Sequence, residues 1–313
     1  MHRLASRLAA PQPRIAADGE PVYRVRSAAA FRGVRAHDVG NGLFVFQQDT
    51  RGVAIEDVVV AGGYRVIENK APVKGEDASV VGIRIRGVRA TDLRRSFARF
   101  RYDSHDGVIE DVSATGTLTT GAHDLPVGIA FGDRAHDFRL ERCTMRGFRW
   151  QRKPGQYWNG DGFSSERGNH GLVFRQCAAW DNSDGGFDLK STDTLLDDCV
   201  SGRNARNYRL WSDIHATRLT SIDPIKLGGV GDTVHFALMA AHRTADQPLV
   251  IRIDHLRVRS SQAWPIFDVH DGVARIEIGS HDIQVPPGTP LVRTRGTAAV
   301  PGGVRFATAP PRL

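Results

Sequence analysis

The chain has 313 residues, of which 41% are hydrophobic and 25% are charged, as in a folded protein with a large core. It has no apolar run near the roughly 18 residues that a membrane-spanning helix needs, which predicts no membrane span. The net charge of +7 favours a polyanionic partner. Because no RRM, zinc-finger or helix-turn-helix pattern accompanies this charge, we expect an acidic polysaccharide as partner rather than nucleic acid.

The three cysteines, Cys143, Cys177 and Cys199, lack the CxxC spacing of a metal or redox site. Their odd number also argues against a disulfide framework, so we expect buried free thiols. The basic N-terminus has no uncharged run long enough for a signal-peptide core. The chain is therefore either cytoplasmic or begins after a removed leader. We expect the second case, with a secreted or periplasmic monomer.

A four-residue repeat runs through the chain: an apolar residue, two mostly polar residues, and a small or apolar residue. It appears at Ile55–Val58, Ile85–Val88, Ile109–Val112, Leu140–Cys143, Phe174–Cys177 and Leu196–Cys199. Weaker copies end at Leu219, Met239 and Leu256. The regular part has a period of about 20 residues, and longer spacings indicate insertions at Thr115–Pro126 and Arg149–Asn159. This pattern predicts a parallel β-solenoid, with both insertions at coil corners where they wall a cleft.

Amphipathic stretches long enough for the connecting helices of an α/β fold are absent from the sequence, which favours an all-β fold. We expect the β-helix to span residues 31–283. Residues 1–30 are predicted to form a lead-in or cap. Residues 284–313, rich in Pro, Gly and Arg, are predicted to form a tail that leaves the solenoid or covers its end.

Four short segments share one alternation, in which an apolar residue is followed by a polar one. They are Phe163-Ser164-Ser165, Phe187-Asp188-Leu189, Tyr208-Arg209-Leu210 and Ile225-Lys226-Leu227. Alternate side chains of a strand face opposite sides, so the first residue of each segment is expected to stack inward. Ser164, Asp188, Arg209 and Lys226 would then form one outward column, which we interpret as a functional site.

Carboxylates gather in the same part of the chain. Asp161, Asp181, Asp184 and Asp188 lie near Asn159 and Asn182. Oxygen ligands of this kind suit a hard cation such as Ca²⁺. The alternative is that these residues only form the turns at coil corners, where Asn and Asp are common.

Three motifs carry a family resemblance: NSDGGFD at Asn182–Asp188, NGDGF at Asn159–Phe163 and IKLGG at Ile225–Gly229. In their order and spacing they resemble the family 9 polysaccharide lyases, which are pectate lyases with a right-handed parallel β-helix. The resemblance implies that Asp161, Asp184 and Asp188 bind calcium and that Lys226 is the catalytic base. Gly185 replaces the second aspartate of the family's DD pair, so we expect calcium to bind more weakly, to recruit Asp181 or Asn182 instead, or to be absent.

The chemistry implied is β-elimination from a uronic acid. Arg209 suits a bidentate grip on the sugar carboxylate, and Lys226 would remove the C5 proton. Lys190, Arg206, Trp158 and Trp211 are candidates for substrate binding. An ordinary lysine is protonated at neutral pH, so we expect an alkaline optimum.

Three other functions fit the same pattern. A uronate C5 epimerase shares the proton abstraction but needs a second acid–base group on the opposite face. A glycoside hydrolase would use two of the carboxylates. A non-catalytic glycan-binding β-helix would need neither.

Overall fold

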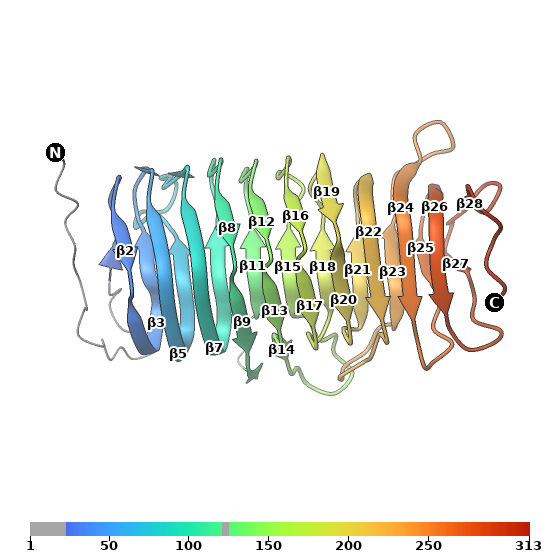
Figure 1. Cartoon of the computed structure of the whole chain (residues 1–313), viewed down its shortest axis with the longest axis horizontal. Coiled ribbons are helices and arrows are strands. Elements are labelled where there is room, and N and C mark those ends of the chain that lie inside the picture. Colours follow the sequence, from blue (N-terminus) through green and yellow to red (C-terminus); the bar gives the residue numbers. More distant parts are fainter. Residues whose placement is uncertain (1–22, 121–124) are drawn as a thin grey trace.

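The computed structural model describes residues 23–120 and 125–313, which form a β-helix of parallel strands with three faces. Successive coils follow one another along the long axis in the order of the sequence (Figure 1). Neither described range contains a helix, so none is present there that could cross a membrane. The predicted all-β parallel β-helix is confirmed.

Short strands build each face, and six long strands pass from one face to the next. The first face holds β1 (Tyr23–Arg24), β11 (Val127–Phe131), β15 (Asp161–Ser165), β18 (Gly185–Leu189), β21 (Arg206–Leu210), β23 (Val234–Met239), β25 (Phe267–His270) and β27 (Val292–Arg295). The second holds β2 (Ala30–Arg32), β8 (Val108–Glu110), β12 (Arg139–Glu141), β16 (Val173–Arg175), β19 (Thr194–Asp197) and β28 (Val304–Phe306). The third holds β9 (Ser113–Gly116), β13 (Thr144–Arg146), β17 (Ala178–Trp180) and β20 (Cys199–Gly202).

The long strands are β3 (Arg35–Phe46), β5 (Ala54–Asn69), β7 (Arg84–Phe100), β22 (Ile214–Ile222), β24 (Leu249–Arg259) and β26 (Ala274–Gln284). Two small pairs stand apart at the corners, namely β4 (Thr50–Arg51) with β6 (Val80–Val81), and β10 (Leu118–Thr119) with β14 (Arg149–Trp150). The second pair joins the two predicted insertions to each other. Residues 121–124 of the first insertion lie outside the described residues.

The four-residue repeat is the corner between the second and third faces. Its apolar first residues stack in register, as in the pairs Ile109↔Leu140 and Leu140↔Phe174. Its third residue has a left-handed backbone at Asp57, Gly87, Asp111, Arg142, Gln176 and Asp198, with φ between 50° and 63°. Such a residue bends the strand sharply, and Gly and Asp adopt this conformation more readily than most. The repeat therefore sets the bend of the chain at this corner of each coil.

An aromatic stack fills the interior behind the first face. Phe163, Phe187 and Tyr208 are fully buried and stack in successive coils, as predicted. The expected fourth member, Ile225, is wrong: it is 40% exposed, and Phe236 continues the stack at 4.9 Å between ring centroids. Ile225 lies in the connection between β22 and β23, which leaves the strand VHFALM to form the next coil.

The three cysteines are free and fully buried, as expected. They pack in the interior as small apolar side chains. Burial raises the pKa of the Cys199 thiol to about 12, so it stays uncharged and unreactive at neutral pH.

Strand pairing extends past both predicted ends of the β-helix. Before residue 31, β1 pairs with β3, and β2, which begins at Ala30, pairs with β5. After residue 283, β27 pairs with β25 and β28 with β26. The Pro- and Gly-rich tail therefore still contributes one strand to each of two faces, because short strands such as VRTR satisfy the hydrogen bonds of the preceding edge. Most of the predicted cap over residues 1–30 lies outside the described residues.

Candidate functional site

Three carboxylates meet in adjacent coils at the first face. Asp161 opens β15, Asp184 immediately precedes β18, and Asp188 lies within β18. All three are buried. The backbone N–H of Gly185 donates to Asp161 Oδ1 at 2.7 Å, which ties the two coils together. The resemblance singled out these three aspartates, and the fold gathers them.

Two arginines from the next coil neutralise this cluster. Arg206 Nη1 lies 2.5 Å from Asp184 Oδ1 and also donates to the Tyr157 hydroxyl at 2.6 Å. Arg209 Nη1 lies 3.4 Å from Asp184 Oδ2 and 3.5 Å from Asp188 Oδ2. The side chain of Arg209 is 20% exposed, so it is the member of the cluster that a ligand reaches most easily.

Trp211 completes the cluster. Its indole Nε1–H donates to Asp188 Oδ1 at 2.7 Å, and its ring lies 4.8 Å from the guanidinium of Arg209. Burial leaves Arg209 Nε without a hydrogen-bond partner among the described residues. A buried donor without a partner costs free energy. The ion pairs with Asp184 and Asp188 and the contact with the Trp211 ring hold the guanidinium in place despite this cost.

Burial and the neighbouring charges shift the pKa values of two of the acids, Asp161 and Asp188. Burial, and then the charges of Asp184 and Asp188, hold the pKa of Asp161 well above its usual range. Burial also raises the pKa of Asp188, although Arg209 opposes it. The two guanidiniums then balance two carboxylates, and Asp161 is the group best placed to keep its proton.

Asp161→Asn is expected to stabilise the fold increasingly as pH rises. Since the folded state raises the pKa of Asp161, the stability that this group contributes is complete below the pKa of the unfolded chain. It is lost as pH climbs towards the folded value. Asparagine keeps an oxygen for the Gly185 N–H but cannot ionise. Thermal unfolding between about pH 4 and 8 checks this.

The control for that series is Asp193→Asn, at an exposed corner. We expect the difference in thermal stability between this variant and the unsubstituted protein to be the same at every pH. If the difference is also constant for Asp161→Asn, ionisation of Asp161 does not lower the stability of the folded state.

The outward column of the first face runs Arg99, Ala130, Ser164, Asp188, Arg209 and Ala237 in register. The predicted neighbours Ser164, Asp188 and Arg209 are confirmed. The predicted fourth member, Lys226, is not on this column, because Ala237 takes the rung after Arg209. Lys226 lies instead in the exposed connection between β22 and β23.

The connection that carries Lys226 nevertheless passes close to Arg206, at the edge of the acidic cluster. Lys226 Nζ donates to Gly231 O at 3.0 Å. A side chain added at Gly231, where φ is +110°, would meet Arg206 and Tyr157 within 3.3 Å, so the backbone packs closely there. Val230 bridges to Tyr157, and the Trp158 ring covers Gly228 and Gly229. Trp158 therefore holds the IKLGG segment rather than standing open towards solvent.

The remaining predicted residues divide between the cluster and its surroundings. Lys190 Nζ binds Glu166 at 2.8 Å and lies 5.7 Å from the Trp211 ring, at the edge of the cluster. Asp181 makes its ion pairs with Arg203 at 2.6 Å and Arg146 at 3.6 Å. It therefore belongs to the coil corner and is not joined to the other three acids.

The acidic cluster fits a calcium ion only in part. Each carboxylate already accepts a hydrogen bond or an ion pair, and the two guanidiniums oppose a further cation. A Cβ at Gly185 would approach Asp161 Oδ1 to 2.8 Å, so the family's second aspartate has no room in this arrangement. The calcium site stays a prediction, and the internal ion pairs compete with it.

Calcium binding is expected to be weak, with a dissociation constant of about 10⁻⁴ M or higher. Arg209→Gln should tighten it, because a competing positive charge is removed. Calorimetric titration of both proteins measures the effect. Lys153→Gln, which removes one charge from the exposed insertion, is the control. If neither protein binds the ion and a chelator leaves activity unchanged, calcium has no part in this site.

The sequence pattern did not reveal that the outward column carries three acid–arginine pairs. They are Glu68 with Arg99, Asp188 with Arg209, and Asp268 with Arg293. The signal was present in YRVIEN, SFARF and IFDVH, which show the same in–out alternation as GFDL. Opposite charges on adjacent strands stabilise each other, so such pairs recur along the column.

Histidines form a second group that the spacing did not indicate. The rings of His105, His136 and His170 stack in successive coils, with centroids 4.6–4.8 Å apart. His136, Asp137 and His170 present atoms within 4.8 Å of one another, close enough to consider a metal. However, His105 and His136 each bond the aspartate that follows them, so the stack is a repeated coil corner.

Comparisons with known proteins are sparse. No family model and no curated protein matched the chain. Among solved structures, the crystal structure of the pectate lyase Pel9A is similar, with 13% sequence identity and a TM-score of 0.38. The alignment covers 87% of this chain and 66% of that one, slightly less than two thirds of its length. At this level of similarity the match carries no argument about activity, and the fold assignment stands on the strand pairing itself.

Proposed function

We propose that the protein is a polysaccharide lyase that cleaves an acidic, uronate-containing glycan by β-elimination. The observation that carries the proposal is the partly exposed side chain of Arg209. Two carboxylates and an indole hold it in place, and it faces out from the β-helix. The motif resemblance to the family 9 lyases supports the same reaction. Secretion or export to the periplasm belongs to this proposal, because the substrate is a polymer.

In this mechanism the guanidinium of Arg209 binds the sugar carboxylate through charge-assisted hydrogen bonding. Its positive charge stabilises the negative charge that develops when the neighbouring C5 loses its proton. The C5–H electron pair forms the C4–C5 double bond, the C4–O4 bond breaks, and O4 takes up a proton from water. Lys226, on the segment packed against Arg206 and Tyr157, is the proposed base.

Hydrolysis is the second candidate, since one observation favours it. The raised pKa values of Asp161 and Asp188 suit a general acid. A hydrolase leaves saturated reducing ends, whereas a lyase leaves unsaturated ends. Product analysis on a panel of acidic glycans therefore separates the two.

Lys226→Ala is expected to abolish the formation of unsaturated ends, and Lys226→Arg should be nearly as inactive because guanidinium stays charged. Folding should not change, since Lys226 is exposed and its amine donates to a backbone carbonyl, that of Gly231. The assay follows the ultraviolet absorbance of the products. Lys74→Ala, at an exposed loop, is the matched control. Full activity of Lys226→Ala would place the base elsewhere.

A further inference from the structure

A hollow lies on the first face, towards the N-terminal end from the acidic cluster. Its volume is about 370 Å³, within the range of sites for small ligands. Four arginines line it: Arg65, Arg95, Arg99 and Arg101. We call this hollow the arginine pocket. Ser96, Leu125, Val127, Ala130, Phe131, Gly132, Ser164 and Glu166 complete its lining.

The arginine pocket lies along the outward column from the candidate site. Arg99 pairs in register with Ala130, Ala130 with Ser164, and Ser164 with Asp188, next to Arg209. Four rungs separate Arg99 from Arg209, about 19 Å at the usual strand spacing. Ala130, Ser164 and Asp188 lie between the two arginines, and the side chains of the first two are small.

Among the described residues of the pocket, two arginines share a single carboxylate. Arg65 is almost fully buried, where it bonds Ser96 and Glu68. Arg99 uses Nε and Nη2 on the same Glu68, at 3.0 and 2.8 Å, so one carboxylate serves two arginines. Burial, and then the nearby charges of Arg99 and Arg95, lower the pKa of Arg65 well below its usual range. Burial, the larger cause, and the neighbouring positive charges both disfavour the charged form of Arg65.

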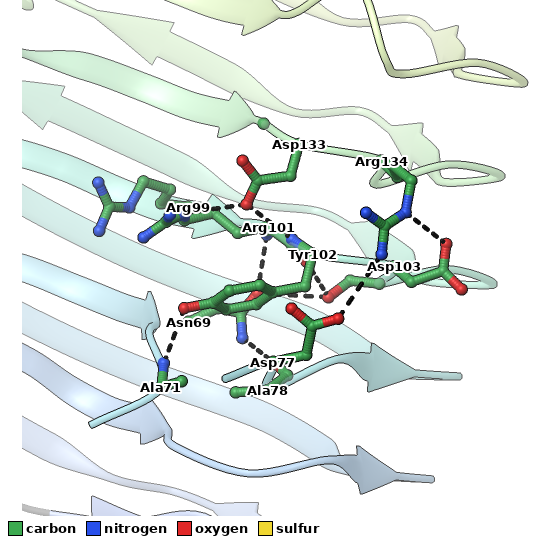
Figure 2. A network of polar contacts seen from close by, with 12 residues as sticks. Asn69, Ala71, Asp77, Ala78, Arg99, Arg101, Tyr102, Asp103, Asp133 and Arg134 are labelled. Atoms are coloured by element: carbon green, nitrogen blue, oxygen red, sulfur yellow. Dashed lines mark hydrogen bonds and ion pairs between the residues drawn. The ribbon is translucent and has the colours of Figure 1, made fainter. Parts of the chain in front are cut away.

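The acids at the edges of the pocket already have partners. Asp133 binds Arg101 at 3.2 Å, and Glu166 binds Lys190. Figure 2 shows Asp133 beside Arg101 and Tyr102, all part of a network that fixes this coil corner. The exposed fractions of the Arg99 and Arg101 side chains are 28% and 30%, so an incoming anion reaches both.

The larger neighbouring cavity, of about 790 Å³, is a weaker candidate. It is lined by the loop of residues 70–77 and by Arg134, which binds both Asp77 and Asp103 (Figure 2). Its charges are mixed and several are paired with one another. Of these two cavities, the arginine pocket is therefore the one expected to bind an external anion more strongly.

We propose that the arginine pocket binds an oxyanion, a carboxylate or a sulfate ester, of the same glycan chain whose uronate lies at Arg209. This inference rests on the proposed function and adds that the substrate is an oligosaccharide with acidic groups at both ends of the span. Guanidinium groups match the geometry of either oxyanion and hold it strongly where water is partly excluded.

Ala130→Glu tests the pocket without removing any of its ion pairs. The new carboxylate lies next to Arg99 on the column and can pair with its guanidinium, which the glycan would otherwise bind. Ala130→Gln has the same size without the charge and is the matched control. The probes are oligosaccharides of polygalacturonate, alginate, hyaluronan and heparin, each as a disaccharide and as a chain long enough to span four rungs.

We expect Ala130→Glu to weaken the binding of the best long probe about tenfold, or about 1.4 kcal/mol, as measured by calorimetry. The disaccharide should bind equally to both variants, because it cannot reach from Arg209 to the arginine pocket. Arg95→Gln, compared with Arg94→Gln on the adjacent exposed position, gives a second pair should Ala130→Glu fold poorly.

The outcomes separate this inference from the proposed function. If unsaturated products form and Ala130→Glu binds long and short probes as Ala130→Gln does, the pocket proposal fails and the lyase stands. If the long probe is weakened but no glycan yields unsaturated ends, the pocket stands and the lyase reaction fails. If no probe binds the unsubstituted protein, both are overturned.

Discussion

Replacing Arg209 with lysine is expected to lower the kcat of glycan cleavage by about 100- to 1,000-fold, the usual cost of losing one donor that stabilises developing charge. Lysine keeps a positive charge between Asp184 and Asp188, so the buried acids are not left without a counter-charge. It loses the planar, delocalised guanidinium, which suits a carboxylate better than an ammonium does. Steady-state kinetics on the preferred glycan, with thermal unfolding of the same samples, measure both properties.

Arg218→Lys is the control for this substitution. Arg218 also pairs with an aspartate, Asp198 at 2.6 Å, but on an exposed coil corner of another face. We expect its kcat to equal that of the unsubstituted protein. A variant Arg209→Lys that folds and retains full kcat would remove Arg209 from the reaction and leave the ion pair with a structural role alone.

Replacing Phe236 with alanine is expected to lower the free energy of unfolding by about 3–5 kcal/mol. Its ring is fully buried between Tyr208 and Phe267, with centroid distances of 4.9 and 5.2 Å. Removing it leaves a cavity that the neighbouring coils cannot close, because the backbone hydrogen bonds of the sheet fix the distance between rungs.

Ile225→Ala is the matched comparison, since the alternation of residues had placed Ile225 at this rung. Its side chain is 40% exposed, so we expect a change within about 0.5 kcal/mol. Urea unfolding of both variants gives the two values. Equal losses of stability would mean that Ile225 contributes to the core as much as Phe236 does, against the observed packing.

The sequence by itself determined the coil. The four-residue repeat, with its left-handed third residue, sets the corner between two faces, and this depends only on neighbours along the chain. The alternation in FDL and YRL likewise places Phe187 and Tyr208 inside, and Asp188 and Arg209 outside. Successive coils without insertions keep this register, so the order of the outward column from Ser164 to Arg209 was predictable.

Only the tertiary structure decided which segment forms the next rung after Arg209. IKLGG and VHFALM both carry the local alternation, but the interior has one place per coil. Phe236 fills it with an aromatic ring that continues the stack, and the segment with Lys226 becomes a connection over the rim. The competition is for buried volume between coils, which no local pattern encodes.

The charge balance of the site was also beyond the sequence. The motif indicated three acids and a cation, whereas the fold brings Arg206 and Arg209 onto those acids and Tyr157 onto Arg206 from an insertion 49 residues away. The arginine pocket arises in the same way, from strands whose residues are distant in sequence and adjacent in register. Side chains from different coils contact one another only after the coils stack. Their pKa values and hydrogen bonds therefore depend on the tertiary structure.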